Sequence, residues 1–178
     1  MTSPLQLTVD CGAGLSLSTS FRFEAGCYRH WIILSRGDDV TLDCWTDQMR
    51  SADDDWPASP PIQQLSLEMI HGAAVLLGVG QAGKSHWSVS VETIQGSSRP
   101  ALQFDLACRC RVRPPWLGSS YARQRDAAGL TEGLTLIPGE ATSQFDDDAA
   151  AVARCQIDPS GSRKYPSTFR WSYRIEVA

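Results

Sequence analysis

Apolar and polar side chains alternate one by one along most of this 178-residue chain, and this pattern restricts its fold more than any other feature. Successive side chains of a β-strand point to opposite faces of a sheet, so such a run has one apolar and one polar face. The pattern occurs in Leu5–Cys11, Leu15–Phe23, Val40–Cys44, Leu65–Met69, Trp87–Val91, Leu102–Val112 and Trp171–Val177. We expect each of these runs to be a strand whose apolar residues face a shared core.

Other stretches complete the prediction of an all-β fold. Trp31–Leu34 and Ala73–Leu77 are continuously apolar, which is typical of strands covered on both faces. Helical patterns are confined to Tyr121–Ala128 and to Ala149–Arg154, the latter preceded by a capping Asp. Pro, Gly and Asp gather in Trp45–Gln64, Arg113–Leu130 and Pro138–Thr168, where we expect long irregular loops. We predict a single-domain antiparallel β-sandwich or barrel over residues 1–178, with one or two short helices.

Charge and hydropathy argue against several classes of protein. The net charge is −4 and the pI is about 5.3, whereas a general nucleic-acid-binding protein carries a basic excess. Charged residues, Gly or Pro interrupt every apolar run before the roughly 20 residues that a transmembrane helix needs. The first residues lack the basic and apolar regions of a secretory signal. We therefore expect a cytoplasmic protein that binds neither membranes nor nucleic acids in general.

Six cysteines are present, and their spacing does not suggest a metal site. They are Cys11, Cys27, Cys44, Cys108, Cys110 and Cys155. We expect reduced thiols that pack as small apolar side chains, since no export signal precedes them. The one close pair, Cys108 and Cys110, has a single intervening residue, whereas structural zinc sites use longer spacings that occur twice. We predict neither a metal nor a cofactor.

Residues 78–85 match the G-x-x-x-x-G-K-[ST] pattern of a phosphate-binding P-loop. If this were a P-loop, Gly78 and Gly83 would let the backbone wrap a nucleotide's phosphates. Lys84 would contact the β- and γ-phosphates, and Ser85 would coordinate Mg²⁺.

The residues that follow do not fit that interpretation. A P-loop continues directly into a helix, whose N-terminal amides and dipole bind the phosphates. Here His86–Ile94 alternates like a strand and ends in a turn. We interpret the glycines as the turn of a β-hairpin that joins Val75–Leu77 to Trp87–Val89. Nucleotide binding through Gly78, Gly83, Lys84 and Ser85 stays as an alternative.

A basic surface is the strongest functional signal. Arg109, Arg111 and Arg113 alternate with apolar residues and should face solvent, and the aromatic residues Trp116 and Tyr121 follow. Guanidinium groups bind carboxylates and phosphates, and Trp and Tyr are frequent anchors of binding sites. The alternative is a polar outer face on which each Arg pairs with an Asp or Glu of a neighbouring strand.

These observations lead to three hypotheses about function. The first is a non-catalytic β-domain that binds an acidic small molecule or a protein partner through Arg109, Arg111, Arg113, Trp116 and Tyr121. The second is the nucleotide-binding alternative, and the third is a self-associating structural protein whose edge strands pair. The chain lacks a G-x-S-x-G elbow and a Cys in a cationic neighbourhood, so no catalytic residue is assigned and enzyme activity stays open. The oligomeric state is also left open.

Overall fold

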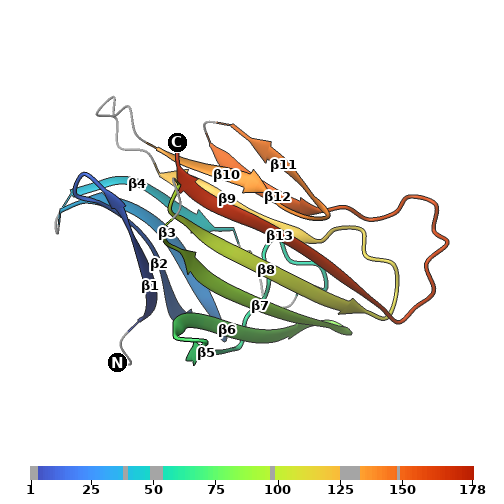
Figure 1. Ribbon diagram of the computed structural model, residues 1–178. Coiled ribbons are helices and arrows are strands. Elements are labelled where there is room, and N and C mark those ends of the chain that lie inside the picture. The colour runs from blue at the N-terminus through green and yellow to red at the C-terminus, as the bar shows by residue number, and fades with distance from the viewer. Residues whose placement is uncertain (1–3, 38–39, 49–53, 97–98, 125–132, 148) are drawn as a thin grey trace.

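Two antiparallel β-sheets lie face to face in the computed structural model of this chain, which describes residues 4–37, 40–48, 54–96, 99–124, 133–147 and 149–178 (Figure 1). The larger sheet has the strand order β1 (Leu5–Gly12), β2 (Leu15–Glu24), β3 (Cys27–Arg36), β4 (Val40–Asp47), β9 (Gly118–Gln124), β12 (Ala150–Cys155) and β11 (Thr142–Asp146). The smaller sheet has the order β10 (Leu134–Pro138), β13 (Ser167–Val177), β8 (Ala101–Cys110), β7 (Ser85–Ile94), β6 (Ala73–Ala82) and β5 (Gln64–Ile70). The all-β prediction is confirmed, and the architecture is a sandwich without a closed barrel.

Aromatic side chains from both sheets meet in the core between them. Leu17, Phe21, Trp87 and Val91 are buried, as their alternation predicts. His30 of β3 lies 6.0 Å from Phe104 of β8, measured between ring centroids. Each large apolar side chain that leaves water stabilises the fold by about 1.5–3 kcal/mol.

The predicted short helices are wrong, because the described residues of both segments belong mainly to strands. Ala150–Cys155 forms β12, Tyr121–Gln124 ends β9, and residues 125–128 lie outside the described part of the chain. Ala-rich sequence favours helix only weakly, and here β12 pairs with β9 on one side and with β11 on the other. Two of the predicted loops are interrupted by strands: β9 lies within Arg113–Leu130, and β11 and β12 lie within Pro138–Thr168. The described residues form no helix that could cross a membrane.

A β-bulge in β4 reverses the faces expected for that strand. Leu34 pairs with Asp43 and Ser35 pairs with Thr41, so Leu42 is an extra residue in the ladder. Beyond a bulge, side chains exchange faces. Asp43, Trp45 and Asp47 are consequently buried, whereas Cys44, which we expected to face the core, is only half-buried.

Several apolar side chains expected on the core face are exposed. Phe23 lies near the end of β2 and Val112 lies beyond the end of β8, where the core no longer covers them. Leu67 and Met69 belong to the edge strand β5 and are 45% and 69% exposed. Leu77 is also exposed, so β6 is covered on one face and not on two.

The glycine-rich motif is the hairpin that the alternation predicts. Ala82 pairs with Ser85 across a two-residue turn, and Ser85 begins a strand instead of a helix. The glycines are needed because residues 54–63, which we call the strap, cross this hairpin. A Cβ atom on Gly80 would lie 1.7 Å from the carbonyl oxygen of Pro61. Gly83 has a φ of +53°, and a Cβ atom there would lie 2.2 Å from Asp55 Oδ1.

Replacing Gly80 should therefore displace the strap. We expect Gly80→Ala to lower the free energy of unfolding by about 1–3 kcal/mol, the usual cost of overpacking. Lys84→Ala, in the exposed turn of the same motif, should change it by less than about 0.5 kcal/mol. Urea denaturation of the two variants measures both values. Equal stability of the Gly80→Ala variant and the wild type would contradict this account of the glycines.

Candidate functional site

An open pocket of about 510 Å³ lies at one end of the smaller sheet. His86, Arg109, Arg111, Tyr165 and Pro166 line it. In Figure 1 this is the end at which β7 begins, β8 ends and β13 begins, beside the connection from β12 to β13. We call it the arginine pocket.

Strand pairing explains how residues far apart in sequence come together here. Arg109 of β8 is the register partner of His86 in β7 and of Thr168 in β13. Cys108 and Cys110 are fully buried, so the residue between them must point to solvent. Arg111 follows the end of β8 and is also exposed.

Among the described residues, the two arginines of the pocket lack the ion-pair partner that three other arginines have. Arg29, Arg99 and Arg123 form ion pairs with Asp47, Glu176 and Asp146. Within the described part of the chain, no ion pair involves Arg109 or Arg111. The alternative interpretation, in which these arginines pair with carboxylates on neighbouring strands, therefore does not hold among the described residues.

Further positive charge lies close by in the fold. The chain has only two lysines. Lys84 occupies the turn directly before β7, and Lys164 directly precedes Tyr165 of the pocket. None of the lining residues is acidic, so the pocket lining carries only positive formal charge in a protein whose net charge is −4, whereas the carboxylate of Asp55 lies against the turn that holds Lys84.

The other three residues of the predicted binding surface lie elsewhere. Arg113 donates hydrogen bonds to the carbonyl oxygens of Asp158 and Pro159, at 3.3 and 3.2 Å, and so holds the connection from β12 to β13. Trp116 is half-buried beneath the guanidinium group of Arg154. Tyr121 is fully buried. Of the five, only Arg109 and Arg111 share the pocket.

Two further polar residues of the pocket, His86 and Tyr165, were missed by the sequence analysis. The outward direction of His86 could have been read from its alternation with Trp87, which is buried. Its position beside Arg109 depends on the register between β7 and β8, which no local pattern specifies. Tyr165 lies in an irregular segment and carries no such signal.

Residues 78–85 do not have the geometry of a phosphate-binding P-loop. Gly78 lies inside β6, which pairs with β5 on one side and β7 on the other. Backbone amides of this strand therefore form hydrogen bonds to the neighbouring strands. Ser85 is buried. Lys84 lies in the exposed hairpin turn.

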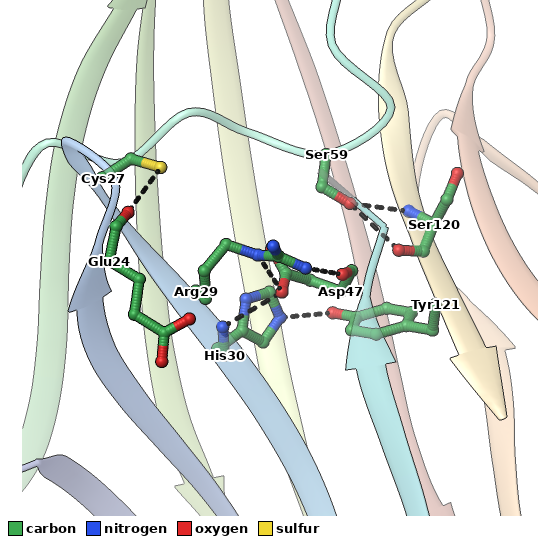
Figure 2. A network of polar contacts seen from close by, with 8 residues as sticks. All are labelled: Glu24, Cys27, Arg29, His30, Asp47, Ser59, Ser120 and Tyr121. Carbon is green, nitrogen blue, oxygen red and sulfur yellow. Dashed lines mark hydrogen bonds and ion pairs between the residues drawn. The ribbon is translucent and has the colours of Figure 1, made fainter. Parts of the chain in front are cut away.

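A second set of polar residues lies buried between the sheets (Figure 2). Arg29 Nε donates to Asp47 Oδ1 at 2.9 Å, and the same oxygen accepts the backbone N–H of His30 at 3.2 Å. His30 Nε2 lies 3.0 Å from the hydroxyl of Tyr121, which lies 2.7 Å from the hydroxyl of Tyr173. The chain of contacts thus runs from β3 through β9 to β13 in the opposite sheet.

Burial keeps the members of this network uncharged, apart from the Arg29–Asp47 pair. Burial lowers the pKa of His30 and raises the pKa of both Tyr121 and Tyr173. The adjoining cavity, lined in part by His30, Ser119 and Tyr173, measures about 10 Å³, which is room for a single water molecule. We therefore assign the network to the stability of the fold and not to ligand binding.

The six cysteines form no disulfide. Cys108 Sγ lies 3.5 Å from Cys110 Sγ, inside the core. Its hydrogen bond with Cys110, together with burial, raises the pKa of Cys108, and burial raises the pKa of Cys155 to about 11. Among the described residues, no group of three or more His, Cys, Asp or Glu side chains is placed to hold a metal ion.

Comparisons of the chain with protein-family models, with curated proteins and with solved structures give no match. The exposed donors of the arginine pocket and the buried network around His30 are two groups of polar side chains within the described residues. Only the first is open to a ligand.

The buried state of His30 predicts how stability depends on pH. Its pKa is lowered in the folded state, so the unfolded chain takes up a proton near the ordinary value of 6.5 that the folded chain does not. The stabilisation that comes from keeping His30 neutral is fully present above pH 6.5. As the pH falls below 6.5, the free energy of unfolding should decrease by up to about 1.4 kcal/mol per pH unit. Denaturation between about pH 5 and 8 measures this slope.

His30→Gln should reduce the slope, because it removes the buried imidazole. The same slope in the His30→Gln variant and in the wild type would show that another group causes the pH dependence.

Proposed function

We propose that this protein binds a small acidic molecule, bearing carboxylate or phosphate groups, in the arginine pocket. The observation that carries the proposal is that two arginines without an ion-pair partner among the described residues line one open pocket. Two like charges held at one site repel each other, and an oxyanion between them would replace that repulsion with two charge-assisted hydrogen bonds.

The donors of the pocket favour an anion over other ligands. Each guanidinium group presents parallel N–H donors that match the two oxygens of a carboxylate or phosphate. His86 and Tyr165 add a ring N–H and a phenol O–H, and no lining side chain carries a carboxylate. The volume of about 510 Å³ falls in the range of about 300–1,000 Å³ typical of small-molecule sites.

Binding fits the pocket better than catalysis. No Ser, Thr or Cys is among its lining residues, so no such nucleophile faces the proposed ligand. A protein partner that presents Asp or Glu could use the same donors. A concave site is better suited to a small molecule than to a flat protein surface, which is why we favour the former.

Titration with citrate and with inorganic phosphate at low salt tests the proposal. We expect binding by the wild type, detected by calorimetry or by shifts of amide resonances in β7, β8 and β13. Arg109→Gln and Arg111→Gln should each weaken it at least about tenfold, because a charged hydrogen bond is worth about 1.5–3 kcal/mol. Arg174→Gln, in β13 but outside the pocket, removes the same charge and should leave affinity nearly unchanged.

Two results would overturn the proposal. One is the absence of binding of either anion by the wild type. The other is equal weakening by Arg174→Gln, which would show a general effect of charge. ATP with Mg²⁺ tests the nucleotide alternative in the same assay: binding lost in Lys84→Ala but kept in Arg109→Gln would favour it.

A further inference from the structure

The four edge strands of the sandwich are not equally protected from pairing with another chain. An edge strand exposes unpaired N–H and C=O groups, and natural proteins limit pairing there with bulges, prolines, charges or short strands. In the described part of the chain, β1 has a register shift between Asp10 and Gly12. Strands β10 and β11 have five residues each, and β10 ends in Pro138. Strand β5 has no bulge and no proline, is longer than β10 and β11, and carries a single charge.

Strand β5 instead has the properties of a strand that can extend a sheet. Its seven residues, Gln64–Ile70, pair with β6 in a continuous register without a bulge. It contains no Pro, and Glu68 is its only charged residue. The turn that joins it to β6 is tight, with positive φ at both His71 and Gly72, so the edge is presented as a regular hairpin.

The side chains around this edge are apolar and exposed. Leu67 and Met69 lie on the face that continues the core, beyond the part that the other sheet covers. Leu77 and Val79 of β6 are exposed on the opposite face. The edge hairpin therefore exposes apolar side chains on both of its faces, which indicates an interaction surface.

We propose that β5 pairs antiparallel with β5 of a second copy of this chain, joining two six-stranded sheets into one continuous sheet. Full overlap of two seven-residue strands about a two-fold axis places Leu67 opposite Leu67 of the second copy. Glu68 then lies opposite Ser66, and Met69 opposite Leu65. Glu68 therefore does not lie opposite Glu68 of the second copy, and the apolar side chains of the two strands meet. The edge is thus self-complementary.

This dimer is independent of the anion proposed for the arginine pocket. The pocket lies at the end of the sheet formed by β7, β8 and β13, whereas β5 is the outermost strand on one side. Pairing through β5 leaves the pocket open. Loss of the dimer should therefore leave anion binding unchanged, and the two proposals can fail separately.

Introducing a charge at Leu67 gives a direct test by analytical ultracentrifugation. We expect the wild type to dimerise reversibly with a dissociation constant between about 1 µM and 1 mM, the affinity range of small interfaces. Leu67→Lys and Leu67→Glu should each be monomeric, with dimerisation weakened at least tenfold, because like charges face each other at the axis. An equimolar mixture of the two should form a heterodimer, since the charges are then opposite.

Val112→Lys adds the same charge at an exposed apolar side chain away from β5 and should dimerise like the wild type. Circular dichroism verifies that each variant is folded. A wild type that is monomeric throughout the range would overturn the proposal, as would dimers that persist in both Leu67 variants. A mixture that stays monomeric would overturn the proposed register.

Discussion

The hydrogen-bonded chain from His30 through Tyr121 to Tyr173 is the constraint on which the arrangement of the two sheets depends. A buried polar group destabilises a protein unless it has a partner, so these three side chains are compatible with only a narrow range of positions of one sheet over the other. Tyr173 belongs to β13, which begins at the arginine pocket. The buried network therefore also positions the strand that directly follows Tyr165 and Pro166 of the pocket.

The sequence predicts the faces of regular strands well and fails where one residue is inserted. Trp87–Val91 and the fully buried Cys108 and Cys110 follow their alternation. The bulge at Leu42 breaks the period in β4, and it is this shift that turns Asp47 inward to bind Arg29 and the backbone of His30. Asp47 lies in Trp45–Gln64, which we expected to be a loop, so the origin of the network could not be seen from sequence alone.

The candidate site was predictable to the extent that it lies on one strand. Arg109 and Arg111 were named because they alternate outward within a local run. His86 and Tyr165 reach the same pocket only through pairing between segments far apart in the chain. Tyr121 was misplaced for a different reason: its hydroxyl makes it resemble a surface anchor, but that hydroxyl is satisfied by His30 and Tyr173 inside the core.

The strap connects the glycine motif to the exposed edge. Tyr28 N donates to Ile62 O at 2.6 Å and Gln63 N donates to Val79 O at 2.9 Å, so the strap is bonded to a strand of each sheet. Ile62 and Asp55 of the strap leave no room for a Cβ atom on Gly78 or Gly83, which explains a glycine spacing that resembles that of a P-loop. The strap then continues directly into β5 at Gln64. The contacts of the strap with the glycine hairpin therefore also fix the position of β5, the exposed edge strand of the smaller sheet.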